Sequence, residues 1–154
     1  AMTNEQTGSG PCGWVGKRGA DGGVQSGVAP LPGGHPEEFV CIDVEAAGFN
    51  YKDALACDAH PGVARTLPLV PGIDVAGTLR SAFEGYSAGT PVVATGNGLG
   101  ESVQGGFATE VWAPPAAIIQ RPESLSAIAA MAMGTAGLTA ILAIERLRVA
   151  IDRE

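Results

Sequence analysis

The sequence predicts a mainly β domain: a small barrel of short strands followed by a helical tail. Two observations carry this prediction. The 154 residues include 23 glycines and 11 prolines, a turn-rich composition that suits short strands. From about residue 124, short stretches between Gly/Pro turns give way to a run rich in Ala, Leu, Ile and Met, which favours helix. The length suits one domain with a proper core.

Three segments are expected: an irregular N-terminal segment over 1–23, the barrel over 24–123 and a helical segment over 124–154. Within the first segment, Cys12–Lys17 favours a short strand, which its two glycines weaken. The Asp-Gly-Gly sequence that follows is typical of a hairpin and leads into a strand at Val24–Val28.

The clearest strand pattern runs over Glu38–Ala47, where side-chain character alternates. Alternate apolar residues from Val40 to Ala46 are expected to share one face, with Cys41, Asp43 and Glu45 on the opposite face. Further strands are expected at Ile73–Arg80, Pro91–Thr95, Phe107–Ala113 and Ala117–Gln120.

A polar cluster follows this strand. Asn50 precedes Asp53 by three residues, the spacing of a helix N-cap followed by an acid, so a short helix is expected to begin here. Tyr51 and Lys52 lie between them, and Asp74 follows the Pro-Gly turn that opens the next strand. Polar side chains at two strand ends and a helix start suit the rim of a pocket.

The C-terminal run predicts two helices, Leu125–Met133 and Thr135–Val149, with Ser124 as N-cap and a break at Gly134. Large apolar residues of these helices do not fall on one narrow stripe, and helices that are apolar all round are buried. A small barrel covers only one side of them. We therefore expect a homodimer through these helices.

The same run is long enough to cross a bilayer, because Ser124–Ile144 carries no charge. It is mostly Ala, Gly, Thr and Ser, however, and lacks aromatic or basic anchors. We therefore expect no membrane association. The N-terminus also lacks the basic-then-apolar pattern of a signal peptide.

The charge and cysteine content of the sequence argue against nucleic-acid binding, a disulfide framework and a zinc cluster. A net charge of −7 without a Lys/Arg stripe argues against nucleic-acid binding. Cys12, Cys41 and Cys57 are odd in number and lack C-x-x-C spacing, which indicates neither a disulfide framework nor a zinc cluster. A reducing cytoplasm is the expected setting.

Three stretches carry a family resemblance: N-Y-K-D-A-L followed by P-L-V-P-G-I-D-V-A-G-T, then T-G-N-G-L-G-E-S-V-Q-G-G-F-A, then G-T-A-G-L-T-A. Together they resemble the medium-chain dehydrogenase/reductase superfamily, in its acrylyl-CoA reductase and zinc-free quinone oxidoreductase branch. The resemblance runs from about Val24 to Leu147 and implies a GroES-like, partly open β-barrel.

The resemblance also bears on metals and cofactors. Zinc-dependent relatives have Cys and His where this chain has Asn50 and Ile73, so we expect no zinc. Family enzymes carry a nucleotide-binding domain after this point, and the sequence contains no strand, glycine turn and helix of that kind. We therefore expect no nicotinamide cofactor. The last stretch, R-L-R-V-A-I-D-R-E, lacks the family's entry into that domain and favours a natural end of the chain.

Two interpretations of the polar cluster stay open. In one, Asn50 caps the helix and Asp53 pairs with a neighbouring base. In the other, which the resemblance favours, Tyr51 lines a substrate cleft as a proton donor, positioned by Lys52 or Asp53. Asp74 either braces the Pro-Gly turn or lies at the pocket floor, and Asp53 or Asp74 is the candidate base.

The remaining candidates come from the later motifs. Asn97 and Glu101 lie in a glycine-rich loop that forms either a flexible lid or a tight turn with positive φ values. Thr135 lies where relatives approach the nicotinamide, or returns a hydrogen bond to its own helix. Together with Asn50 and Lys52, these residues are expected to bind substrate.

Three functions are compatible with these residues. The first is a stand-alone substrate domain that binds an enone, quinone or acyl thioester and performs isomerisation, elimination or cyclisation without nicotinamide, as in natural-product biosynthesis. The second is a fragment or half of an NADPH-dependent enoyl or quinone reductase. The third is a non-catalytic protein that binds a small molecule or a partner.

Overall fold

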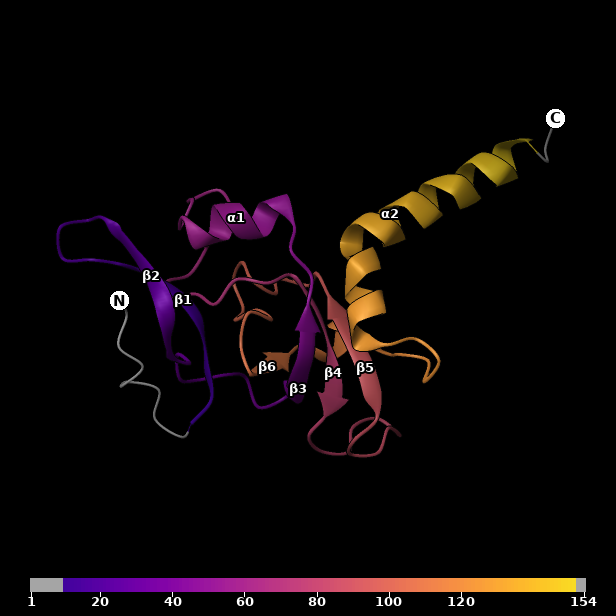
Figure 1. The fold of residues 1–154 in the computed structure, drawn as a ribbon, viewed down its shortest axis with the longest axis horizontal. Coiled ribbons are helices and arrows are strands. Elements are labelled where there is room, and N and C mark those ends of the chain that lie inside the picture. Colours follow the sequence, from indigo (N-terminus) through magenta and orange to yellow (C-terminus); the bar gives the residue numbers. More distant parts are fainter. Residues whose placement is uncertain (1–9, 152–154) are drawn as a thin grey trace.

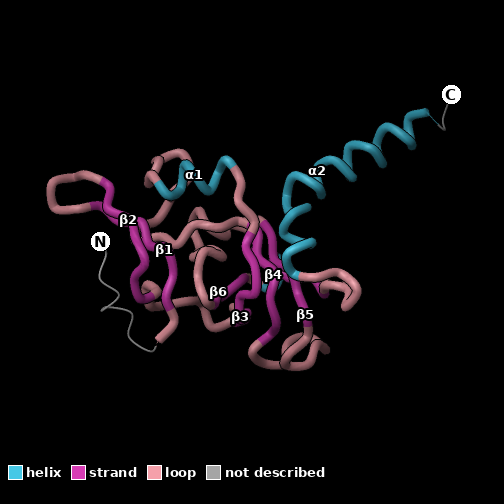
Figure 2. The backbone as a smooth tube through the Cα atoms, viewed as in Figure 1, coloured by secondary structure: helices cyan, strands magenta, loops and turns pink. Residues whose placement is uncertain are grey.

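The computed structural model describes residues 10–151 and has the predicted architecture, mainly β with a C-terminal helix (Figures 1 and 2). The elements in chain order are β1 (Cys12–Arg18), β2 (Val24–Pro30), β3 (Val40–Ala47), α1 (Tyr51–Cys57), β4 (Asp74–Leu79), β5 (Pro91–Thr95), β6 (Glu110–Ala113), a 3-10 turn η1 (Pro115–Ala117), β7 (Ile118–Gln120) and α2 (Ala127–Ile151).

The strands form two antiparallel sheets, one of β1 and β2 and one in the order β6-β3-β4-β5-β7. Isolated bridges from Gly13 to Ala108 and from Gly16 to Leu69 join the first sheet to the rest. The expected hairpin is present, so a regular strand occupies part of the segment that we expected to be irregular. The division of the chain at residues 23 and 123 stays a prediction.

The main core lies within the five-stranded sheet and is built from β-branched and leucine side chains, among them Ile42, Val75, Leu79, Val92 and Val111. Alternation along β3 is less regular than predicted. The register shifts between Val44 and Ala46, a bulge at Glu45.

Cys41, predicted on the face of β3 opposite Val40 and Ile42, is only 2% exposed, so this second face is covered as well. Its strand neighbour on β6 is Trp112, and Arg80 pairs with Asp43 and Glu110 beside it, which covers this face of β3. Burial is the main cause that raises the pKa of Cys41 to about 11.

Helix α2 has two parts, as the sequence predicts, because Gly134 interrupts it with φ 46° and ψ −154°. We call Ala127–Met133 the α2 base and Thr135–Ile151 the α2 arm. The base packs on the sheet through Ala127 and Ala130, whereas the arm points away from it (Figure 1). The predicted N-cap, Ser124, is wrong: Ser126 Oγ accepts the Ala129 N–H at 3.1 Å.

By length and composition alone, Ala127–Arg148 passes as a membrane-crossing helix, with a mean hydropathy of 2.0. Its apolar side chains are mostly exposed, unlike those of a core helix.

Candidate functional site

The predicted helix start is confirmed. Asn50 is the N-cap of α1, and Asp53 reaches back so that its Oδ2 accepts the Asn50 backbone N–H at 2.7 Å. This is the acid half of a capping box, which satisfies a backbone donor that the helix itself leaves free.

The other carboxylate oxygen of Asp53 ties this helix to the turn before β4. Its Oδ1 accepts the backbone N–H groups of Gly72 at 3.1 Å and Ile73 at 3.0 Å. Gly72 has φ +108°, and a Cβ there would lie 2.7 Å from the Gly106 nitrogen, so only glycine fits. Asp53 therefore braces the Pro-Gly turn, which was one of the two roles considered for Asp74. Its partners are amides and not the neighbouring base of the first interpretation.

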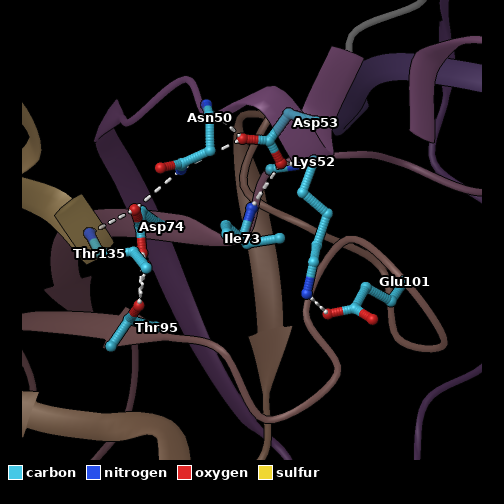
Figure 3. A network of polar contacts seen from close by, with 9 residues as sticks. Asn50, Lys52, Asp53, Ile73, Asp74, Thr95, Glu101 and Thr135 are labelled. Carbon is cyan, nitrogen blue, oxygen red and sulfur yellow. Dashed lines mark hydrogen bonds and ion pairs between the residues drawn. The ribbon is translucent and has the colours of Figure 1, made fainter. Parts of the chain in front are cut away.

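Asp74 is the centre of a second cluster, and only 1% of it is exposed (Figure 3). Its Oδ2 accepts the Asn50 side-chain N–H at 2.9 Å and the Thr135 backbone N–H at 2.8 Å. Its Oδ1 accepts the Thr135 hydroxyl at 2.6 Å and the Thr95 hydroxyl. Burial raises the pKa of Asp74, but hydrogen bonds from Thr135, Thr95 and Asn50 outweigh it and lower the pKa below its ordinary value.

This cluster anchors the α2 arm. Thr135 is the first residue after the kink, so Asp74 places a carboxylate at the N-terminus of the arm, where backbone N–H groups are free and the helix dipole favours negative charge. The hydroxyl of Thr135 donates to Asp74 and lies 3.1 Å from that of Thr95, so of the two alternatives considered for Thr135 the bond to its own helix is not formed.

The remaining candidates lie away from this cluster. Tyr51 is 80% exposed at the start of α1. Lys52 and Glu101 form an ion pair at 3.0 Å between α1 and the glycine-rich loop (Figure 3). Asn97 has φ 51° and donates to the Thr95 carbonyl at 3.2 Å, as the tight-turn interpretation predicts.

Two cavities mark places for a ligand. One, of about 200 Å³, opens inside the bend of α2, and we call it the kink pocket. Its wall is almost entirely apolar, and its polar residues are Asp74 and Thr95 at the end nearest the cluster. The lining residues are Asp74, Val93, Thr95, Ile119, Leu125, Ala130, Met131, Met133, Gly134, Leu138 and Ile141.

The other cavity, of about 350 Å³, lies beside β6, where the rings of His35 and Trp112 stack with their centroids 3.5 Å apart. It is larger, yet none of the predicted site residues lines it. Of those residues, only Asp74 borders the kink pocket. Sequence reasoning missed Thr95 and the methionine wall, because nothing local marks residues that a kink brings together.

The described residues do not form a nucleotide fold. Strand pairs within residues 10–151 are antiparallel, and the loop after β5 leads to β6 and not to a helix. A dinucleotide site needs a parallel strand, a glycine turn and a helix N-terminus. The same part of the chain holds no group of three metal-binding side chains.

Comparison with known proteins agrees with this geometry. Residues 36–123 match the alcohol dehydrogenase GroES-like domain. The chain belongs to this family. The probable acrylyl-CoA reductase of Escherichia coli and a putative quinone oxidoreductase of Bacillus subtilis are each 41% identical to it over 113 residues, or 73% of the chain.

Solved structures show the same fold. A Salmonella enterica oxidoreductase in complex with NADP has a TM-score of 0.82 and 35% identity over 90% of this chain. A Bacillus subtilis protein with NAD bound has a TM-score of 0.80 and 36% identity over 90% of this chain. The GroES-like chain covers 43% and 42% of these two structures. It spans about a third of the length of the curated relatives, 35% and 34%. It is a quinone oxidoreductase-like domain of the medium-chain dehydrogenase/reductase type.

Proposed function

We propose that this GroES-like chain is the substrate-side domain of an oxidoreductase-type protein and that it binds a small enone, quinone or acyl thioester in the kink pocket. The carrying observation is the pocket itself, an apolar space of about 200 Å³ with a polar edge at one end. Ligand pockets are mostly apolar with a few placed polar groups, and they typically hold about 300–1,000 Å³. This smaller pocket therefore limits the ligand part that enters it to a small group such as a short acyl chain or a single ring.

The hydrogen-bond inventory of the polar edge limits what the pocket does alone. A threonine hydroxyl has one hydrogen to donate, and those of Thr95 and Thr135 both go to Asp74. Asp74 already accepts four donors, and its lowered pKa makes it a weak base. These contacts support a binding role and do not favour Asp74 as the group that removes a proton.

The cofactor-independent hypothesis places the chemistry on Tyr51 and on Asp53 or Asp74. Tyr51 is largely exposed and lines neither cavity, and Asp53 is fully buried with both oxygens bonded. Isomerisation, elimination or cyclisation by this chain therefore has less support than ligand binding. A purely binding role for a small molecule or a partner needs none of these groups.

The reductase hypothesis is favoured by one specific observation. Solved relatives carry NADP or NAD, and this chain matches less than half of each. In such an arrangement the chain provides the substrate wall and another unit provides the nucleotide. Cys12, Cys41 and Cys57 are all free, which supports a reducing, cytoplasmic setting.

The test is calorimetric titration with propionyl-CoA and with duroquinone, a quinone that has no free ring carbon for the cysteines to attack. We expect saturable binding of at least one of them. A parallel titration with NADPH separates the chemistries: no heat is expected, because the described residues lack a nucleotide fold. Saturable NADPH binding would instead contradict cofactor-independent chemistry and revive the hypothesis of a reductase. No binding of either probe would contradict the proposal.

A further inference from the structure

A second ligand-sized space in this chain is the cavity of about 350 Å³ beside β6, which we call the β6 cavity. Its volume lies within the range of about 300–1,000 Å³ that is typical of small-molecule sites. Its described lining residues all lie between Pro11 and Trp112, so strands and loops of the GroES-like domain build it and helix α2 does not line it. The function proposed for the kink pocket leaves this cavity unexplained.

Backbone contacts fix one wall of the β6 cavity. Gln104 Oε1 accepts the Val70 N–H at 2.7 Å, and Gln104 Nε2 donates to the Pro68 carbonyl at 3.1 Å. The next residue, Gly105, donates its N–H to the Val70 carbonyl at 2.7 Å. A Cβ at Gly105 would lie 2.5 Å from the Pro71 carbonyl oxygen, so the two segments pack too closely for any other residue. This wall of the cavity is therefore preformed.

The rest of the lining is mainly apolar and aromatic. The rings of His35 and Trp112 stack in parallel, with 7° between their planes. Apolar side chains continue the wall: Leu31, Phe39, Val70, Val103 and Val111. Flat rings pack well against aromatic and branched aliphatic side chains, so this lining favours a ligand with a flat ring.

Glu110 is the one fully charged residue among the described lining residues. Its side chain is only 12% exposed, and its Oε2 lies 2.6 Å from Arg80 Nη1. Its Oε1 has no hydrogen-bond donor within residues 10–151, and it can accept an N–H from a ligand. Arg80 also pairs with Asp43, so one positive charge serves two acids and the group of three keeps a negative charge.

We infer that the β6 cavity binds a small aromatic cation, such as an aryl amidinium or an aryl ammonium compound. Its ring packs beside the His35–Trp112 stack, whose π-systems attract a cation, and its charged N–H group donates to Glu110 Oε1. Two further acids, Glu37 and Glu38, follow in the same loop as His35. Together with the net charge of −7, they favour a cation over an anion.

The first test uses three ligands of one shape: benzamidine, benzamide and benzoate, which are a cation, a neutral amide and an anion at neutral pH. By calorimetric titration we expect saturable binding of benzamidine with a Kd of about 1 mM or tighter, weaker binding of benzamide and no binding of benzoate. No saturable binding of benzamidine, or equally tight binding of benzoate, would overturn the inference.

The second test locates the ligand. The indole N–H signal of Trp112, assigned by its loss in Trp112→Phe, should shift and saturate with benzamidine in NMR spectra, whereas that of Trp14, outside the cavity, should not. The methyl signals of Met131 and Met133 in the kink pocket should also stay unmoved. Movement of the methionine signals without Trp112 would place the cation in the kink pocket and contradict the inference. Failure here leaves the function proposed for the kink pocket intact, because quinone and acyl-thioester binding does not use Trp112.

The third test removes the charge and keeps the shape. Glu110→Gln should weaken benzamidine binding by at least about tenfold and change benzamide binding by less than about twofold. The matched control is Asp43→Asn, which removes the other acid beside Arg80 but does not alter the lining, and it should keep benzamidine binding. Equal losses in the two variants would rule out direct contact with Glu110. If Glu110→Gln fails to fold by circular dichroism, the three-ligand series on the unmodified chain decides the question.

Discussion

The start of α1 and the kink of α2 both fix the beginning of a helix, but in different surroundings. Each holds a helix start against the sheet through one buried carboxylate, Asp53 with 0% and Asp74 with 1% of its surface exposed. Asp53 is enclosed by backbone amides of its own helix and of the Gly72–Ile73 turn, and it lines neither of the two cavities described above. Asp74 borders an open apolar pocket. Burial and acid chemistry therefore do not distinguish these two carboxylates, whereas a neighbouring cavity does.

The largest expected effect is on the enclosed acid. Asp53→Ala leaves the buried N–H groups of Gly72 and Ile73 without acceptors, so we expect the free energy of unfolding to fall by about 3 kcal/mol or more. Urea denaturation measures it. The control Asp58→Ala, at an exposed acid just after α1, should stay within about 0.5 kcal/mol. If Asp53→Ala lowers the free energy of unfolding by less than about 1 kcal/mol, Asp53 does not stabilise the contact between α1 and the Gly72–Ile73 turn as described.

The kink offers the matching test at the second acid. Gly134 has φ +46°, and a Cβ there would lie 2.7 Å from Asp74 Oδ2. Gly134→Ala combines backbone strain with this close contact, so we expect a loss of about 2 kcal/mol by denaturation. Gly27→Ala, where a Cβ meets nothing within 4 Å, should be nearly neutral. Equal effects of the two variants would mean that the kink is not held by Asp74.

The pH dependence of the free energy of unfolding should show whether the Asp74 carboxylate is charged in the folded protein. Because the folded pKa of Asp74 is lowered, its contribution is fully present above its ordinary pKa of 3.8 and is lost as the pH falls through the folded value. Wild type should therefore exceed Asp74→Asn in unfolding free energy by about 1–2 kcal/mol at pH 7. The gap should narrow below about pH 4. If the difference in unfolding free energy between wild type and Asp74→Asn does not depend on pH, a charged Asp74 carboxylate in the folded protein is contradicted.

The smallest effect is expected at Tyr51. Its exposed ring has little packing to lose, so Tyr51→Phe should change the unfolding free energy by less than about 0.5 kcal/mol and ligand affinity by less than about twofold. If the hydroxyl is a general acid, turnover should instead fall by about 10²-fold. Activity assays on enone and acyl-thioester substrates decide between these two outcomes.

What the sequence predicted was mostly local. The Asn50–Asp53 helix start depends on residues three apart, and strands such as Pro91–Thr95 are short segments between turn residues, so both were predicted correctly. The family motifs added the GroES-like fold. Each of these signals lies within a short window or repeats a known pattern.

What the sequence could not supply depends on distant residues meeting. Asp74 finds its main partner, Thr135, 61 residues later, and only the bend at Gly134 brings the two together. The kink pocket arises from the same bend against β5 and β7. The bulge at Glu45 and the cover over Cys41 likewise depend on neighbouring strands.

The central claim is that the kink pocket binds the ligand, and its own methionines report on it. Met131 and Met133 line the pocket, so their methyl signals, followed by NMR during titration with duroquinone and with propionyl-CoA, should shift and saturate together. Ile141→Phe fills the pocket and should weaken binding by at least about tenfold. Ile144→Phe is the same change at similar exposure outside the pocket, and should not weaken it. Unmoved methyl signals, or equal loss in both variants, would contradict the claim.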